Sequence, residues 1–293
     1  MRLVFRLFRL VTLISLLFWG AVLVHILTAQ PVIKPPSDMP QSFADCTGSY
    51  AMASPYVEVQ AEVKRRCADY FAVMGDRAVP LLGVNLGRLG FLTCSTPQEA
   101  CDTLLAALDG KIPTEQRHRL RCRVYRLPAD CPDVIPGPEH LIVERTALND
   151  VVVSQPKMAR LFELDAFVDG DAVTTYRADG LIISTPTGST AYNLAAGGPI
   201  LMPNMEALVV SPICPHTLTA RPLVVHLRSL VEIRPGREAT QVLLTVDGQW
   251  SHMLCASDLV QVTCSDHPLT IFRPRNRSFF DLLRTKLHWG VRV

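Results

Sequence analysis

Short apolar runs alternate with polar residues over positions 113–269, and aspartates, glycines and prolines separate them. This spacing is typical of a β-sandwich or an irregular β-domain, because strand side chains point alternately to the two faces of a sheet. The sequence therefore predicts a β-rich domain over 113–269. We expect its strands within the segments 118–127, 140–154, 161–180, 222–236, 241–249 and 258–265.

Helical patterns occur on both sides of this domain. Thr96 and Pro97 introduce the segment 98–110, which predicts a capped helix that ends at Gly110. The tail 278–290 carries apolar residues on one helical face, so we expect it to pack back on an N-terminal α/β unit. This partial nucleotide-binding α/β domain is assigned to residues 57–112 together with 270–293.

The first residues have a different pattern. Arginines precede an apolar run at 11–27, and its length of about 17 residues is at the lower limit for spanning a bilayer. Residues 1–29 therefore fit a signal anchor, a cleaved leader or an organelle-targeting segment, and a buried core helix is the alternative. Residues 30–56 are rich in Pro, Ser and Gly without a period, which is typical of a linker.

The stretch 179–199 combines a strand, a hydroxyl-rich loop and a helix. Apolar residues 181–183 predict a short buried strand, and residues 191–196 predict a helix. A helix N-terminus offers unpaired N–H groups and a partial positive charge, and Gly188 lets the backbone approach a ligand closely. Such a loop suits a nucleotide, and simple helix capping by the hydroxyls is the alternative. The candidate nucleotide-binding residues of this loop are Thr187, Gly188, Ser189 and Thr190.

Composition narrows the function classes. With 48% hydrophobic and 19% charged residues, the chain is an ordinary folded protein rather than a disordered one. A formal net charge of +2 is too small to argue for nucleic acid as a partner. The tight basic cluster at 117–123 is interpreted as a solvated strand face, with a phosphate-binding patch as the alternative. The 9 cysteines and 8 histidines are irregularly spaced, which argues against a metal site and a disulfide framework and favours a reducing compartment.

Six segments of the chain match one known family in their sequence and in their order: 83–93, 147–154, 179–200, 211–225, 246–249 and 278–290. Together they resemble the NAD kinase family, which transfers the γ-phosphate of ATP to the 2′-hydroxyl of the adenosine ribose of NAD. The resemblance implies an α+β fold with two domains: a truncated, Rossmann-like N-terminal α/β domain and a C-terminal β-sandwich-like domain, with the C-terminal helix returning to the first. It also implies ATP and NAD as partners, Mg²⁺ with ATP, and a homodimer or homotetramer.

The same resemblance implies a site. It implies that Asn149 and Asp150 hold the adenosine part of NAD and that Asp179 lies near the other nucleoside. An amide and a carboxylate suit adenine edges and ribose hydroxyls. Alternatives from the residues alone are a plain turn at 149–150 and an ordinary core position for Tyr192. His216 is interpreted as structural and Asp247–Gly248 as a β-turn. The loop residues that the resemblance places in the pocket are Thr187, Thr190, Ala191 and Tyr192.

The chain departs from the family at one motif. Members carry a GGDG sequence after an early strand, whereas only Gly75 and Asp76 stand at the corresponding place. Asp76 is the candidate catalytic base. Two alternatives to a working kinase stay open: a catalytically impaired NAD-binding relative that lacks the phosphate loop, and a membrane-attached lipid kinase. We expect the folded domain in the cytosol, with a mitochondrial or membrane-anchored location as the alternative.

Overall fold

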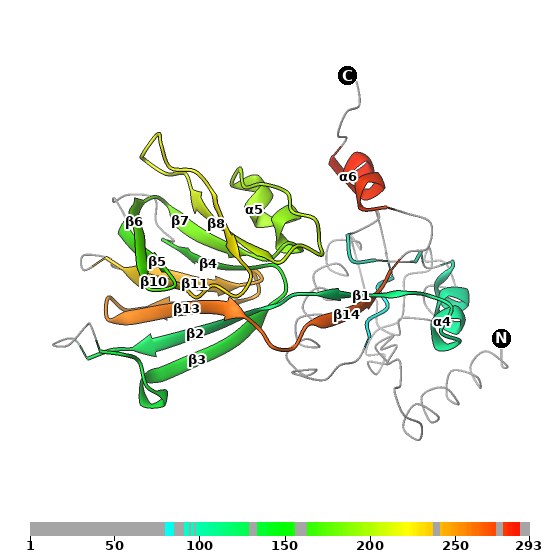
Figure 1. Cartoon of the computed structure of the whole chain (residues 1–293), viewed down its shortest axis with the longest axis horizontal. Helices are drawn as coiled ribbons and strands as arrows, with labels where there is room; N and C mark the ends of the chain where they lie inside the picture. The colour runs from blue at the N-terminus through cyan, green and yellow to red at the C-terminus, as the bar shows by residue number, and fades with distance from the viewer. Residues whose placement is uncertain are drawn as a thin grey trace, which may run out of the picture. The chain divides into compact units, whose positions relative to one another are not determined.

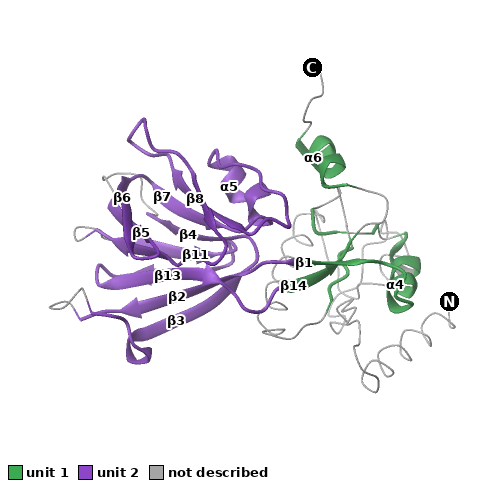
Figure 2. Cartoon of the chain, viewed as in Figure 1, with its two compact units in different colours: residues 1–116, 269–293 green, residues 117–268 purple. Residues whose placement is uncertain are grey.

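In the computed structural model, two compact units account for the chain (Figure 1). Unit 1 takes residues 1–116 and 269–293, and unit 2 takes residues 117–268 (Figure 2). The predicted leader at 1–29, the linker at 30–56 and Asp76 lie outside the described residues. The structure describes residues 80–84, 91–93, 95–96, 98–128, 134–155, 163–236, 241–273 and 278–287.

Unit 2 consists of two sheets of six strands each, with antiparallel pairing throughout. The strands of the first sheet are β2 (Leu120–Arg126), β3 (Leu141–Ala147), β5 (Glu163–Val168), β6 (Asp171–Arg177), β10 (Val231–Pro235) and β13 (Asp258–Cys264). The strands of the second are β4 (Asp150–Ser154), β7 (Gly180–Ser184), β8 (Ala207–Ile213), β9 (Leu223–His226), β11 (Val242–Val246) and β12 (Trp250–Leu254). Their orders are β3-β2-β13-β10-β5-β6 and β12-β11-β4-β7-β8-β9.

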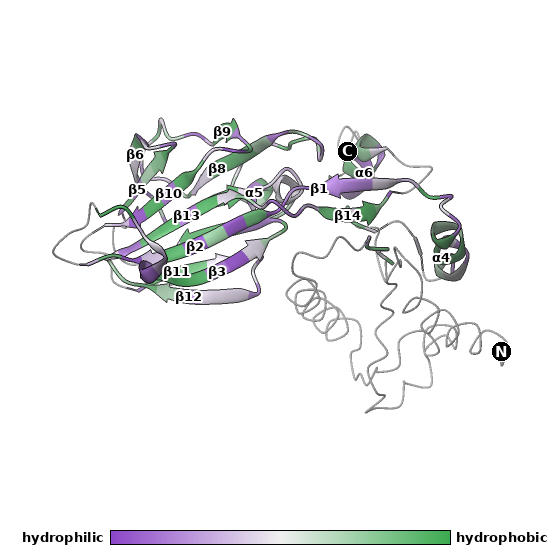
Figure 3. Cartoon of the chain, turned by 60° about the horizontal axis from the view of Figure 1, so that its bottom comes forward, coloured by the Kyte–Doolittle hydropathy of each residue, from purple (hydrophilic) through white to green (hydrophobic). Residues whose placement is uncertain are grey.

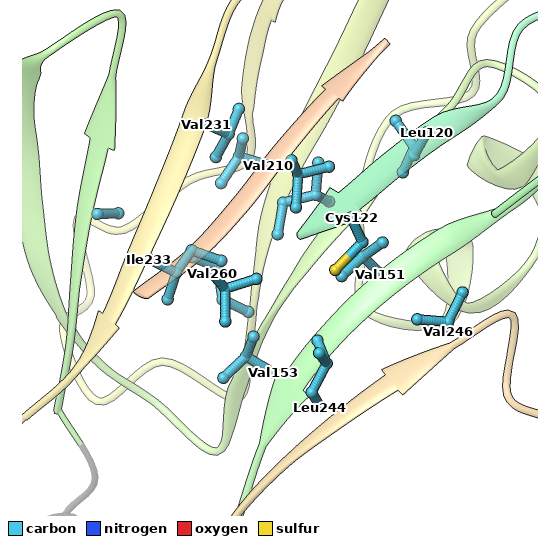
Figure 4. Close-up of a cluster of buried hydrophobic side chains, with 14 of the residues drawn as sticks. Leu120, Cys122, Val151, Val153, Val210, Val231, Ile233, Leu244, Val246 and Val260 are labelled. Carbon is cyan, nitrogen blue, oxygen red and sulfur yellow. The ribbon is translucent and has the colours of Figure 1, made fainter. Parts of the chain in front are cut away.

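The core of unit 2 lies between the two sheets. Strand β2 illustrates the principle, because Leu120, Cys122 and Val124 are fully buried while the intervening arginines face outward. This alternation of hydrophobic and hydrophilic residues along β2 is visible in Figure 3. Side chains from both sheets meet in one hydrophobic cluster (Figure 4). Burial there raises the pKa of the Cys122 thiol to about 12. The predicted β-sandwich is thus confirmed.

Strands β4 and β7 are buried on both faces. All residues of β7 are buried, and so are the first four residues of β4. The outer side of β7 is in contact with α5 (Tyr192–Ala195), a short helix that follows the 3₁₀ turn η2 (Gly188–Thr190). A strand that packs against apolar groups on both faces reads as a continuous apolar run, which is why Leu181, Ile182 and Ile183 predicted it correctly.

Unit 1 contributes smaller pieces. Strands β1 (Thr114–Arg117) and β14 (Leu269–Phe272) form a two-stranded sheet, and Leu81 adds a parallel bridge to Ile271. Helix α4 (Ala100–Leu108) ends before Gly110, whose φ is 69°, as predicted. Helix α6 (Phe279–Leu287) buries Leu282 and Leu283, and the ring of Phe279 lies 6.0 Å from that of Phe91.

The structure tests the expected helices to different extents. The tail is helical and contacts Phe91 of unit 1 as expected, but Phe280 is half exposed and does not belong to the buried face. The α/β character expected for residues 57–79 falls outside the described residues. None of the described helices has the length and apolar character that a bilayer crossing requires.

Candidate functional site

The turn between β3 and β4 is held by the carboxylate of Asp247. This group accepts hydrogen bonds from the backbone N–H groups of Leu148, Asn149 and Asp150, at 2.8, 2.7 and 3.1 Å. In return, the backbone N–H of Asp247 donates to the carbonyl oxygen of Asp150 at 3.0 Å. Asp247 and Gly248 have φ values of 50° and 67°, the left-handed pair of a type I′ turn. The predicted β-turn is confirmed, and its aspartate also anchors a neighbouring turn.

Thr185 holds the same turn from the other side. Its Oγ1 donates to the carbonyl oxygen of Leu148 at 2.6 Å, and its backbone N–H donates to that of Asn149 at 2.9 Å. The Oγ of Ser184 adds a longer bond to the Asn149 carbonyl at 3.3 Å. All backbone donors and acceptors of Leu148 and Asn149 are therefore paired inside the protein, which fixes the turn in one conformation.

Gly188 packs against this turn. A Cβ atom at this position would lie 2.0 Å from the carbonyl oxygen of Asn149, which no side chain could accommodate without movement of the backbone. The backbone N–H of Gly188 donates to Oγ1 of Thr185 at 3.0 Å. The glycine thus lets the two protein segments approach each other. The predicted close approach of Gly188 to a ligand stays a prediction.

The interior of the loop is organised by Ser189 and Asn193, both fully buried. The Ser189 hydroxyl donates to the carbonyl oxygen of Pro186 at 2.6 Å and accepts from the N–H of Leu201 at 3.0 Å. The Asn193 amide donates to the carbonyl oxygens of Ser189 and Pro199, and its oxygen accepts from the hydroxyl of Ser211 at 2.6 Å. Ser189 therefore has a structural role, and its contact with a nucleotide remains a prediction.

The helix expected at 191–196 is present as α5, which has 4 residues. Neither α5 nor η2 has a side-chain hydrogen bond at its N-cap, so the alternative of simple helix capping by the hydroxyls is not seen. Thr185 instead accepts the Gly188 N–H from a position outside η2. The macrodipole of so short a helix is small, and the predicted nucleotide contact at its N-terminus stays a prediction. Residues 188–190 form a 3₁₀ turn, in which hydrogen bonds of the Thr185 and Thr190 hydroxyls to the backbone accompany the tighter winding.

Three polar side chains on these segments have no hydrogen-bond partner among the described residues. No hydrogen bond within the described part of the chain ends on the side-chain amide of Asn149 or on the carboxyl oxygens of Asp150. Thr187 is 6% exposed, and its Oγ1 is buried without a hydrogen-bond partner. Buried polar groups normally find partners, so the unpaired hydroxyl of Thr187 marks a place where a ligand can supply one.

Asp150 is the titratable group among these three side chains, and its pKa is shifted. Its residue is 5% exposed at the start of β4, where it pairs with Ser184 of β7. Burial, together with the nearby negative charge of Asp247, raises the pKa of the Asp150 carboxyl to about 7. Burial also raises the pKa of Asp247, while its three backbone donors act in the opposite direction. Perturbed carboxyls of this kind cluster at functional sites.

Comparison with known proteins places this turn at the beginning of a family match. Residues 148–273 match the ATP-NAD kinase C-terminal domain. The NAD kinases of Geotalea daltonii and Thiobacillus denitrificans are each 43% identical to this chain over 220 residues. The matches span 75% of this chain and 74% and 72% of the two relatives. The chain belongs to the NAD kinase family.

Two solved structures extend this family likeness to the fold. Yeast NADH kinase complexed with NADH superposes with a TM-score of 0.66 and 28% identity, over 75% of this chain and 61% of the yeast chain. An Archaeoglobus fulgidus NAD kinase in complex with ATP superposes with a TM-score of 0.57 and 28% identity, over 72% of this chain and 76% of the Archaeoglobus chain. The fold class and the family predicted from the sequence are confirmed.

Within this NAD kinase fold, the remaining predicted residues lie in different places. Thr190 donates to the carbonyl oxygen of Thr187 at 3.2 Å, and Ala191 joins η2 to α5. Tyr192 is 47% exposed, which excludes the alternative of a core position. Asp179 precedes β7, whereas the loop follows it, so about 16 Å of strand separates the two ends. Within one chain Asp179 is therefore away from Asn149, and its predicted role remains a prediction.

Sequence reasoning missed the residues that shape this NAD kinase site. Thr185 was counted only among the hydroxyls that could cap the helix after the loop, Asp247 only as part of a turn, and Asn193 was not singled out. A signal did exist for Asp247, because Asp-Gly after a run of alternating residues is a strong hairpin marker. Its contact with residues about a hundred positions earlier depends on the pairing of β4 with β11, which no local pattern reveals.

The basic cluster at 117–123 and His216 lie on or beside the strands of the sandwich. Arg121 and Arg123 on β2 pair with Asp266 and Glu144 at 2.8 and 2.6 Å, as a solvated strand face would. Arg117 and Arg119 are buried, so that interpretation fails for the first half of the basic cluster. His216 is exposed, and its backbone N–H donates to the carbonyl oxygen of Arg177.

Proposed function

We propose that this chain is an NAD kinase that phosphorylates the 2′-hydroxyl of the adenosine ribose of NAD with ATP and Mg²⁺. The observation that carries the proposal is the Leu148–Asn149 turn. Its backbone is fully paired, yet the side chains of Asn149 and Asp150 have no hydrogen-bond partner among the residues that the structure describes. A rigid backbone that presents uncommitted polar side chains is what nucleotide recognition needs.

The side chains suit an adenosine ligand. An amide both donates and accepts, so Asn149 can pair with an adenine edge or with ribose hydroxyls. At neutral pH the Asp150 carboxyl exists partly as the protonated acid, because its pKa is raised to about 7, and it can then donate as well as accept. The buried hydroxyl of Thr187 adds a third group. These roles agree with those that the family resemblance implies.

Phosphoryl transfer depends mainly on positioning and on neutralisation of the phosphate charge. The described residues contain no group of three or more His, Cys, Asp or Glu that could hold a metal ion. In this proposal Mg²⁺ is therefore held chiefly by the ATP phosphates and water, its usual mode of binding in kinases, and supplies charge neutralisation there. Asp76 is the proposed base for the 2′-hydroxyl.

A direct assay tests the proposal. Purified full-length protein is incubated with NAD, ATP and Mg²⁺, and NADP is measured with an NADP-specific dehydrogenase. We expect NADP that depends on all three reactants and that falls in Asn149→Ala. Wild-type protein that forms no NADP and binds no NAD would reject the proposal.

A second function is favoured by one observation. The sequence has a single Gly75–Asp76 pair where the family motif has GGDG, so part of the phosphate loop is absent. A relative of this kind would bind NAD at Asn149 and Asp150 without phosphorylating it. Calorimetric binding of NAD together with background NADP formation would identify this function, and turnover above background would exclude it.

A further inference from the structure

Asp247 and Asp150 are neighbouring carboxylates with opposite roles in the hydrogen-bond network. Both oxygens of Asp247 accept from backbone N–H groups, and Oδ1 accepts from two of them. No described hydrogen bond ends on the oxygens of Asp150. Donors that point at a carboxylate favour its ionised form, whereas burial without donors favours the protonated form. If one proton is shared between the two groups, it therefore belongs to Asp150.

Among the described residues, Asp247 is the charged group that acts on the Asp150 carboxyl. Asp150 is the first residue of β4, which lies between β7 and β11. The sequences of β4, β7, β11 and residues 184–191 contain no charged residue apart from Asp150 itself. Asp247, one position beyond β11, is thus the charged group that faces Asp150 from the elements packed against it.

We propose that Asp247 is a positioning residue of the NAD site. It fixes the backbone of residues 148–150 and, in addition to the burial of Asp150, its charge favours the neutral form of the Asp150 carboxyl, so that Asp150 donates a hydrogen bond to an acceptor atom of the nucleotide. This inference rests on the proposed function, since it assigns the ligand of Asp150. It adds a dependence on pH that a permanently ionised carboxylate would not produce.

The direction of this dependence follows from the protonation state. Below the raised pKa of Asp150, which is about 7, the carboxyl can donate and NAD binds. Above it the donor is lost and a negative charge faces the acceptor atom of the ligand, so affinity decreases as pH rises. If only the protonated form binds, affinity falls by about tenfold for each pH unit above the pKa.

Calorimetric titration of the full chain with NAD, from well below to well above pH 7, tests the inference with two variants. Asp247→Asn removes the charge, keeps one oxygen for two of the three N–H groups and tolerates the left-handed backbone. We expect the midpoint of the pH profile to move to lower pH. Asp150→Asn carries a permanent donor, so its profile should be flat through the same range.

The chain offers a matched control. Asp169 also precedes a glycine in a hairpin turn, has a φ of 54° and accepts one backbone N–H, from Leu230 at 2.8 Å. It joins β5 to β6 in the other sheet, so Asp169→Asn should keep the wild-type profile.

Each outcome has a separate meaning. Wild-type protein that binds no NAD at any pH would reject the proposed function and, with it, the ligand assigned to Asp150. NAD binding with an affinity independent of pH would reject this inference alone. So would an Asp247→Asn midpoint equal to that of the wild type, or an Asp150→Asn profile that still falls near pH 7.

Discussion

The main chain of Gly188 lies against the main chain of Asn149, so closely that a Cβ atom on Gly188 would be 2.0 Å from the Asn149 carbonyl oxygen. The contact joins two segments that are about 40 residues apart in the sequence and adjacent at the ends of β4 and β7. The position of the Asn149 side chain therefore depends on a residue that has no side chain of its own.

Gly188→Ala should separate these two segments. Overpacking of this kind typically costs about 1–3 kcal/mol in the free energy of unfolding. We expect this loss in urea denaturation, together with weaker NAD binding in calorimetry. Gly110→Ala is the control, since its Cβ would meet nothing within 4 Å and only its φ of 69° adds strain. Unchanged NAD affinity in Gly188→Ala would contradict the argument.

Asn149→Ala should weaken NAD binding by about 1–3 kcal/mol, because the polar groups of the ligand then lose their hydrogen-bond partner. Stability should change little, since the side-chain amide makes no hydrogen bond with the described residues. Calorimetry measures the affinity. The exposed Asn204 provides the control, and an Asn204→Ala protein should bind NAD as the wild type does.

Asn193→Ala should destabilise the loop without touching a ligand. It leaves the hydroxyl of Ser211 and the carbonyl oxygens of Ser189 and Pro199 without a partner, at a cost of about 1–3 kcal/mol. Ser211→Ala alone leaves only the Asn193 oxygen unpaired. Because the two residues share a bond, the double variant should lose less stability than the sum of the single ones. Strict additivity in urea unfolding would show that the contact contributes nothing.

Asp150→Asn should change how stability depends on pH. The folded-state pKa of Asp150 is about 7, above the ordinary value of 3.8, so the wild type loses stability as pH rises between these values. The asparagine variant lacks this loss. Its advantage should grow by up to about 1.4 kcal/mol for each pH unit across that window. Urea unfolding on either side of the window measures the difference, and a constant difference would contradict the raised pKa.

Asp76→Asn separates catalysis from binding. If Asp76 is the base, turnover should fall by about 10²-fold or more, while NAD affinity persists. Asp102→Asn, on exposed α4 surface, serves as the control for a change of charge. Turnover that survives Asp76→Asn would move the role of base to another carboxylate, with Asp150 the next to test.

The sequence predicted what depends on local periodicity. The buried run 181–183 and the alternating arginines of β2 were interpreted correctly, because side-chain period follows directly from burial on one or two faces. Strand β12 was missed, since Trp250, His252 and the polar residues around them show no simple alternation of apolar side chains.

The candidate site was predicted only in part. Asn149 and Asp150 came from the family resemblance, and Thr187 came from the hydroxyl-rich loop as well, but the residues that support them were not predicted. Asp247 and Thr185 act through contacts of high sequence separation, set by the pairing of β4 with β11 and β7. The helix after Thr190 was predicted at 191–196 and is found at Tyr192–Ala195, because its small and aliphatic residues favour a helix and Gly197, with a φ of 81°, ends it.

The reactivity of Cys122 can report how often the two sheets of the sandwich separate. Its thiol lies between the sheets with no exposed surface and with a pKa raised to about 12, so it reacts with a thiol reagent only when the sheets separate. The exposed Cys214 and Cys255 react at once, so the measurement uses a variant in which the other 8 of the 9 cysteines are replaced by serine. The rate at which Cys122 is modified thus measures spontaneous opening of the core, and slower modification in the presence of NAD would report ligand binding without any measurement of catalysis.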